Sequence, residues 1–235
     1  SSSMLLEGPL DVAALEQSIC EIVRRQEVLR SRFLSAEGAP YQVIEPALDW
    51  RLPVTDLAGC DAAEALADRL AAVLARQPFD LARAGAWRVH LLRLAGERHL
   101  LVVVMHHIIS DAWSMGVLRR ELAALYEARL VGRPGPLPEP EVQYVDFAQW
   151  QRQWLAGEVL EFQMRYWKEQ LAGAPAVLEL PTDRPRPAVQ SYQGARRTLL
   201  LDAPLSAALA ALAREENATL FMTLLAAFQA LLYRY

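Results

Sequence analysis

The feature that most constrains the fold of this chain is a run of six apolar residues that leads directly into two histidines. The run covers residues 100–105 and is followed by His106, His107 and, four positions further on, Asp111. Six residues cannot cross a membrane, and a run of this kind predicts a buried strand. Since successive side chains of a strand point to opposite faces, we expect His106 to point inward and His107 to face an open cleft.

The segments around this strand predict a sheet packed against helices. We expect an antiparallel hairpin of strands over 87–94 and 98–105 and short strands over 41–44 and 198–201. Apolar residues recur at helical spacing in several other segments. These helices are expected from Asp11 to about residue 29, over 61–76 and 111–130, from 144, and over 161–171, 202–216 and 219–235. The fold class is therefore α/β, of the layered α+β type.

An arginine-rich segment lies at the far end of the first predicted helix. It contains Arg24, Arg25, Arg30 and Arg32. Such a run is commonly a solvated face. The alternative is that one arginine turns inward to meet a buried acid. On that alternative we expect Asp111 to lock its turn by pairing with Arg25 or Arg30, since a buried ion pair is costly to break from one side.

Composition and charge exclude several classes of protein. The content of 53% hydrophobic and 22% charged residues is typical of a globular protein, and the net charge of −4 gives no reason to expect nucleic acid as a partner. Cys20 and Cys60 make neither a disulfide framework nor a metal-ligand pattern. The sequence begins without signal-peptide character, and the apolar run over 220–233 is too short to span a bilayer. We expect no membrane association and a cytoplasmic protein.

Two other chemistries for the histidine pair are weaker. A metal site is disfavoured because the two imidazoles should point in opposite directions, no His-x-x-x-His helix is present and no cysteine is near. We therefore predict no metal ligands. A serine hydrolase is disfavoured because the chain has no Gly-x-Ser-x-Gly segment.

The histidine segment resembles a family signature. His106-His107-x-x-x-Asp111 with Ser114 three residues later is similar to the motif of condensation domains of nonribosomal peptide synthetases, which belong with the chloramphenicol acetyltransferase-like acyltransferases. Further segments resemble the family in the same order, at residues 24–33, 78–81, 144–151 and 180–187. Two positions depart from the family pattern: Gln26 replaces a histidine, and Ala112 stands where glycine is usual.

The resemblance implies a two-lobed architecture with the active site in a channel between the lobes. On this basis residues 1–172 are the N-terminal lobe, 173–197 a proline-rich crossover, and 198–235 the first elements of an incomplete C-terminal lobe. The opening segment before Leu5 and the rest of the second lobe are expected to be missing. We therefore expect the isolated chain to be inactive.

The resemblance also implies an activity. Condensation domains join a carrier-bound acyl or peptidyl thioester donor to the amine of a carrier-bound aminoacyl acceptor. Residues 111–118 resemble the type that joins two L-configured residues. The substrates would be presented on phosphopantetheine arms, with no tightly bound cofactor. The partners would be carrier proteins and neighbouring adenylation domains.

The site residues that the resemblance implies have different roles. His107 would hydrogen-bond the acceptor amine and either take its proton or steady the tetrahedral species, while His106 would fix the local structure. Backbone N–H groups of Ala112 and Trp113, beside Ser114, lie at a predicted helix start, where they could face an oxyanion or a thioester carbonyl.

Two alternatives stay open. The chain could be an epimerisation-like or ester-forming relative, because sister domains share the histidine motif. It could instead be a non-catalytic lobe that only folds or binds a carrier protein.

Overall fold

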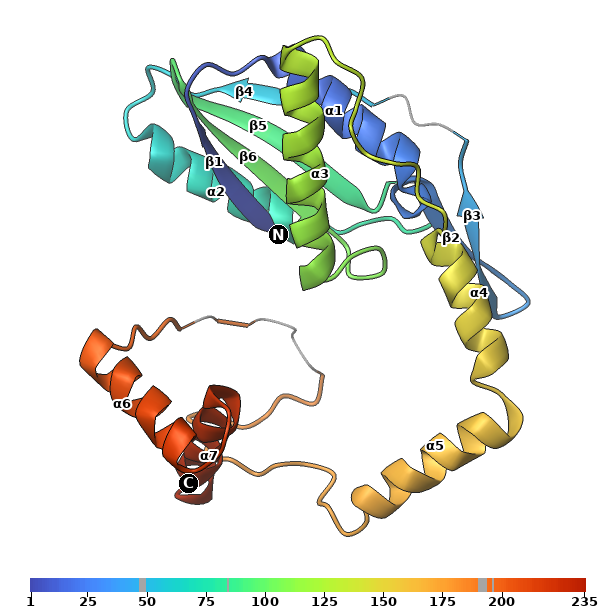
Figure 1. Ribbon diagram of the computed structural model, residues 1–235, viewed down its shortest axis with the longest axis vertical. Coiled ribbons are helices and arrows are strands. Elements are labelled where there is room, and N and C mark those ends of the chain that lie inside the picture. Colours follow the sequence, from blue (N-terminus) through green and yellow to red (C-terminus); the bar gives the residue numbers. More distant parts are fainter. Residues whose placement is uncertain (47–49, 84, 190–193, 196) are drawn as a thin grey trace. The chain divides into compact units, whose positions relative to one another are not determined.

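The computed structural model describes residues 1–46, 50–83, 85–189, 194–195 and 197–235, and the chain divides into two compact units (Figure 1). The units are Ser1–Gln163 and Met164–Tyr235. The division falls within helix α5 (Gly157–Gln170), earlier than the boundary at residue 172 expected from the sequence.

The first unit is built on a mixed four-stranded sheet. Its strands, in order across the sheet, are β1 (Ser2–Glu7), β6 (Arg98–Met105), β5 (Trp87–Ala95) and β4 (Val54–Asp56). The β1–β6 and β6–β5 pairs are antiparallel, whereas β4 runs parallel to β5. The predicted hairpin of β5 and β6 is therefore confirmed, and β6 lies in the interior of the sheet.

Helices cover both faces of this sheet (Figure 1). Helices α1 (Val12–Arg25) and α3 (Ala112–Leu130) pack on one face, and α2 (Ala63–Arg76) packs on the other. Four consecutive residues of β6 are buried, alternately toward the two faces: Leu101, Val102, Val103 and Val104. A strand buried on both sides needs a continuous apolar sequence, which is what residues 100–105 supply.

The first helix ends earlier than the sequence pattern indicated. Asp11 caps it as predicted, because its Oδ1 accepts a hydrogen bond of 2.9 Å from the Ala14 N–H group. At Gln26 the backbone becomes extended, and the chain tightens into the 3-10 helix η1 (Glu27–Arg30). This break redirects the chain into the strands that follow.

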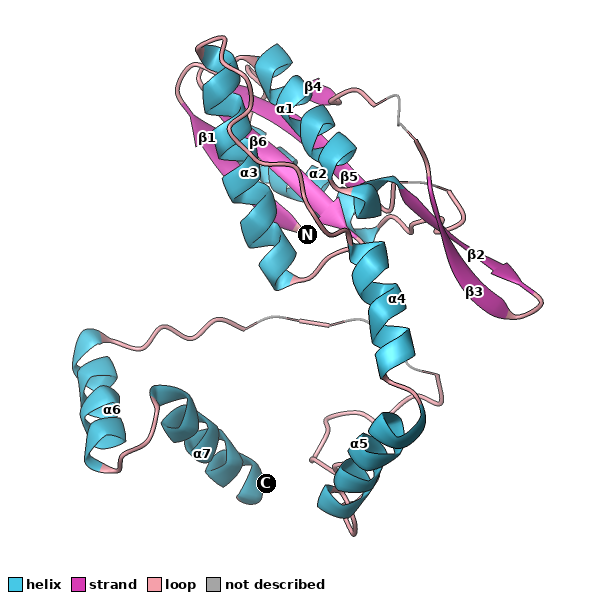
Figure 2. Ribbon diagram, turned by 45° about the vertical axis from the view of Figure 1, so that its right-hand side comes forward, coloured by secondary structure: helices cyan, strands magenta, loops and turns pink. Residues whose placement is uncertain are grey.

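A second, two-stranded sheet follows η1 (Figure 2). It pairs β2 (Ser31–Ala36) with β3 (Ala39–Ile44) in antiparallel register. The sequence predicted β3 but missed β2, as it also missed β1 and β4. All three missed strands carry polar residues and are partly exposed, so their sequences lack the apolar signal of β6.

The remaining predicted helices are present. Helix α4 (Tyr144–Trp154) belongs to the first unit, and the second contains the end of α5 together with α6 (Ala203–Glu215) and α7 (Leu220–Tyr233). Asp202 and Thr219 cap α6 and α7 as expected. No helix in the described ranges is both long enough and apolar enough to cross a lipid bilayer.

The strand predicted over 198–201 is wrong. These residues have no regular secondary structure, and the side chains of Leu199 and Leu200 are exposed. A β-prone sequence forms a strand only where a neighbour pairs with it. Residues 173–189 of the expected crossover contain neither helix nor strand, and its residues 190–193 and 196 lie outside the described residues.

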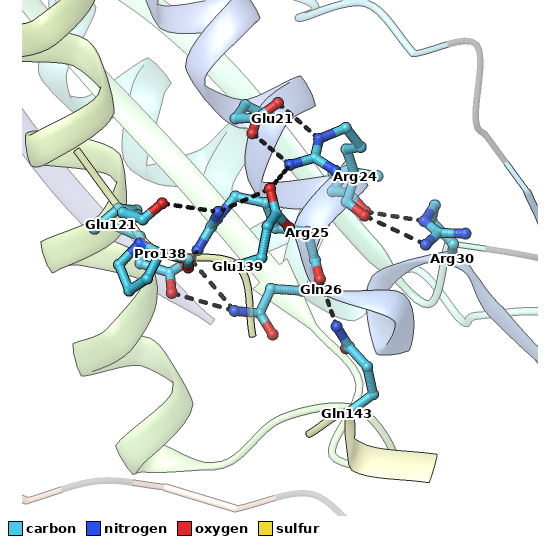
Figure 3. A network of polar contacts seen from close by, with 11 residues as sticks. Glu21, Arg24, Arg25, Gln26, Arg30, Glu121, Pro138, Glu139 and Gln143 are labelled. Carbon is cyan, nitrogen blue, oxygen red and sulfur yellow. Dashed lines mark hydrogen bonds and ion pairs between the residues drawn. The ribbon is translucent and has the colours of Figure 1, made fainter. Parts of the chain in front are cut away.

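Two arginines turn inward at the end of α1 (Figure 3). Arg30 is 8% exposed, and its Nε and Nη2 atoms donate to the carbonyl oxygens of Val23 (3.1 Å) and Arg24 (3.3 Å). The last carbonyls of a helix have no partner within it and carry partial negative charge, so a buried guanidinium satisfies them well. A further donor of Arg30 reaches the Glu45 carbonyl in the loop after β3.

Arg25 likewise donates to backbone carbonyls, in this case those of the segment that precedes α4. Its Nη1 donates to the Leu137 carbonyl at 3.3 Å, its Nη2 donates to the Pro138 carbonyl, and the Glu139 carboxylate lies 3.5 Å away. Both arginines therefore turn inward, but the buried acid that was expected to receive one of them is not found at either. Their main partners are backbone carbonyls.

We predict that Arg30→Met lowers the free energy of unfolding by about 3 kcal/mol, because it leaves several buried carbonyls without a donor. Urea denaturation at pH 7 measures the change. The matched control is Arg69→Met on the exposed side of α2, which should change stability by less than about 0.5 kcal/mol. Equal stabilities of the two variants would contradict this role for Arg30.

Candidate functional site

The two histidines follow the end of β6. The strand ends at Met105, and residues 107–109 form a turn, so neither ring is on the strand as the sequence predicted. Their surroundings nevertheless differ. The His106 ring is partly buried and meets Phe79 edge-on, with centroids 6.0 Å apart, whereas His107 is exposed and lines a pocket.

His106 holds the turn through several hydrogen bonds. Its N–H group donates to the Ala86 carbonyl at 2.9 Å, which joins the start of the turn to the chain just before β5. Its Nδ1 accepts from the Ile108 N–H group at 3.0 Å, and its carbonyl accepts from Ile109 N–H at 3.1 Å and from the Ser110 hydroxyl at 3.2 Å. The bond at Nδ1 places the proton of the neutral ring on Nε2. His107 is thus carried by a turn that His106 fixes.

Phe79 is itself held by Arg88. The Arg88 guanidinium carbon lies 3.8 Å from the centre of the Phe79 ring, which is a cation–π contact. The same side chain donates to the carbonyls of Gln77 and Pro78. The segment after α2 therefore forms a fixed support for the His106 ring.

The pocket beside His107 has a volume of about 320 Å³ and belongs to the first unit. Its walls come from the end of α1, η1, the turn after β6, the first half of α3 and the start of α4. Most of the lining is apolar, and the polar members are Gln26, His107, Ser110, Asp111, Ser114, Glu121 and Tyr144. Trp113 also lines it and is 77% exposed. An apolar pocket with a few polar groups is typical of a small-molecule site.

Asp111 acts as the N-cap of α3. Its Oδ1 accepts from the Ser114 N–H group at 2.8 Å and from the Ser114 hydroxyl at 2.7 Å, while the Asp111 N–H group donates to that hydroxyl at 3.2 Å. The N–H group and the hydroxyl of Ser114 hold the pKa of Asp111 below its ordinary value of 3.8. The Asp111 carboxylate therefore serves as a helix cap, paired with Ser114.

The predicted ion pair of Asp111 with Arg25 or Arg30 is therefore wrong. Both guanidinium groups are committed to backbone carbonyls around the end of α1. Asp111 instead uses donors within three residues of itself. It still fixes the turn, but by capping a helix.

The capping also affects the N–H groups expected to face an oxyanion. After the two groups of Ser114, the N–H group of Trp113 also helps to lower the pKa of Asp111. An oxyanion at Trp113 would have to share this N–H group with the Asp111 carboxylate. Ala112 is the first residue of α3, and its side chain is exposed.

Two pocket residues were given no role from the sequence. Gln26 Nε2 donates to both carboxylate oxygens of Glu121, at 3.2 and 3.4 Å (Figure 3). Glu121 follows Ser114 by seven residues, with Val117 and Leu118 between them, so these positions share one helix face. That periodicity could have found Glu121.

No group of three or more His, Cys, Asp and Glu side chains in the described part of the chain is arranged to hold a metal ion.

Comparison with known proteins identifies the family. The family model described as Condensation domain matches residues 1–235. The chain therefore belongs to the condensation domain family of nonribosomal peptide synthetases, and its structure is a chloramphenicol acetyltransferase-like lobe with further elements. The resemblance inferred from the motifs is confirmed.

The relatives agree with this assignment. A linear gramicidin synthase polypeptide of Brevibacillus parabrevis is 50% identical over 236 residues, which cover 100% of this chain and 5% of that protein. The X-domain from teicoplanin biosynthesis is 35% identical with a TM-score of 0.87, over 99% of this chain and 52% of that one. The first condensation domain of the CDA synthetase is 26% identical with a TM-score of 0.80, over 99% and 56%. The chain thus spans about half of these solved domains.

We predict that Asp111→Ala destabilises the protein, because the first turn of α3 loses its cap. The folded pKa of Asp111 lies below 3.8, so this stabilisation is fully present above that pH and is lost as the pH falls through the folded pKa. Urea denaturation at pH 6 and pH 3 should show a smaller difference in stability between wild type and variant at pH 3 than at pH 6.

The control is Asp111→Asn, which keeps a capping oxygen but does not titrate. On going from pH 6 to pH 3, the Asp111→Asn variant should lose less stability than wild type does, because its cap keeps the same charge. If the free energies of unfolding of wild type and Asp111→Ala differed by the same amount at both pH values, the ionised carboxylate would not be the capping group.

Proposed function

We propose that this chain is part of a domain that forms an amide bond between a carrier-bound acyl or peptidyl thioester and the amine of a carrier-bound aminoacyl thioester. The observation that supports this most directly is the position of His107, which lines a pocket of about 320 Å³ on a turn fixed by His106. The relatives named above support the same chemistry. The motif after His107 favours the type that joins two L-configured residues.

The reaction does not require a strong base. A free α-amine has a pKa of about 7.7–8.0, so roughly a tenth of it is neutral at pH 7, and deprotonating the rest costs only about 1 kcal/mol. Larger contributions come from holding the amine and the carbonyl together and from stabilising the oxyanion. His107 accepts a hydrogen bond from the amine and takes its proton or steadies the tetrahedral species.

The other site residues support His107. His106 fixes the turn, Asp111 and Ser114 fix the start of α3, and the buried Arg25 and Arg30 hold the end of α1 that forms one pocket wall. The N–H groups of Ala112 and Trp113 lie at the start of α3, close to where a thioester carbonyl would enter the pocket. These residues support the site or lie beside the channel, and His107 is the residue that we propose to contact the reacting amine.

The proposal includes the wider setting. Residues 1–172 form the N-terminal lobe, 173–197 the crossover, and 198–235 the start of the C-terminal lobe, which agrees with the share of the solved domains that the chain covers. The substrates arrive on phosphopantetheine arms of carrier proteins, with adenylation domains as neighbours in the cytoplasm. No tightly bound cofactor takes part.

The test uses a polypeptide that contains the complete domain, mixed with carrier-bound donor and acceptor thioesters, with the product measured by mass spectrometry. We expect His107→Ala to reduce dipeptide formation by about 10²-fold or more, which is typical for the loss of a positioned acid–base group. His107→Gln separates the two roles, because glutamine can hydrogen-bond the amine but cannot take its proton. The 235-residue chain alone should give little or no product.

Thermal denaturation of each variant provides the folding control. Undiminished product from a folded His107→Ala variant would overturn the proposal. An epimerised thioester, or an ester formed when a carrier-bound hydroxyacyl acceptor replaces the aminoacyl one, would assign the chain to one of the related subtypes instead. A complete domain without turnover that still binds carrier protein would favour the non-catalytic alternative.

A further inference from the structure

We propose that Glu121 is the counter-ion for the ammonium form of the ligand that enters the pocket beside His107. The inference rests on the proposed function for the identity of that ligand, an α-amine, and adds a residue that determines specificity. Glu121 lies on α3 and lines the same pocket as His107.

The charges around the pocket support a cationic ligand. Among the described residues that line it, two are acidic, Asp111 and Glu121, and none is arginine or lysine. The Asp111 carboxylate already serves the first turn of α3. Glu121 is therefore the pocket carboxylate that remains for a ligand, and much of the lining around it is apolar, which strengthens a charge–charge contact.

The hydrogen bonding of Glu121 leaves room for such a ligand. Gln26 Nε2 lies 3.2 and 3.4 Å from the two carboxylate oxygens, so the two oxygens share a single amide nitrogen (Figure 3). A carboxylate has about four acceptor positions. The contact with Gln26 thus orients the group without saturating it, and Gln26 is a positioning residue for Glu121.

The α-amine of the acceptor is mainly in its ammonium form at neutral pH, which is the form that Glu121 would bind. At pH 7 roughly nine tenths of an α-amine with a pKa of about 7.7–8.0 is protonated. An ammonium group at Glu121 would be held in the same pocket as His107, ahead of the proton loss that precedes attack. A hydroxyl or an acylated amine would lack the charge, so Glu121 would favour free amines over both.

The test measures binding without chemistry. The probes are L-leucine N-butylamide and its analogue in which a hydroxyl replaces the ammonium group, both of which have an unreactive amide in place of the thioester. Calorimetry or NMR titration with the 235-residue chain at low ionic strength should show that the amine binds about tenfold more tightly, as expected for one charge-assisted hydrogen bond. Glu121→Gln should reduce this ratio to about one, and Gln26→Leu should reduce it less, because the charge remains.

The matched control is Glu127→Gln, which removes the same charge from an exposed position on the same helix and should leave the ratio at about ten. A second measurement needs no variant and so does not depend on variant folding. In the unmodified chain, the ratio of the two affinities should fall as the salt concentration is raised, because salt screens the charge. Equal binding of the two probes by the unmodified chain, or an unchanged ratio in folded Glu121→Gln, would overturn the inference.

The outcome is distinguishable from failure of the proposed function. A preference for the amine that depends on Glu121, in a complete domain that forms no amide, would support the amine site and reject the proposed reaction. Amide formation that depends on His107, without any effect of Glu121→Gln on the binding ratio, would do the reverse.

Discussion

The pocket depends on the burial of β6 on both faces of the sheet. Because helices cover its two sides, the strand cannot shift by one residue without moving Leu101 and Val102 into the wrong layers. The fixed register determines where the strand ends, and the bond from His106 N–H to the Ala86 carbonyl joins that end to the neighbouring chain. The position of His107 therefore follows from packing that lies several residues away.

Much of this fold could be predicted from local sequence patterns. The hairpin of β5 and β6, most of the helices and the caps at Asp11, Asp202 and Thr219 all depend on residues a few positions apart. The strands β1 and β4 could not be predicted in this way, because they pair with strands distant in the sequence. Strand β2 pairs with the neighbouring β3 and was missed because its sequence is mostly polar and lacks a clear apolar alternation. The failed strand over 198–201 is the converse case, an apolar segment with β propensity that lacks a pairing partner.

The site, too, could be predicted only where local sequence patterns determine it. His107 lines the pocket and His106 supports the turn, but both residues follow the end of β6, so the strand alternation used to separate them does not apply. The roles assigned to the two rings stay predictions. The partner of Asp111 was wrong, because a long-range ion pair with Arg25 or Arg30 was preferred over the local pattern Asp-x-x-Ser, which is a capping signal. The burial of both arginines depends on carbonyl groups whose positions no side-chain pattern records.

Gln143 connects the pocket to the helix that leads out of the first unit. Its side chain donates to the Arg25 carbonyl at 2.9 Å and accepts from the Glu27 N–H group at 3.1 Å, at the break between α1 and η1 (Figure 3). It is also the N-cap of α4, and η1 contributes Val28 and Leu29 to the pocket lining. A force that pulls on α4 would therefore reach the pocket wall through the Gln143 amide group as well as through Tyr144, which lines the pocket. Gln143 thus couples the reacting cavity mechanically to the following chain.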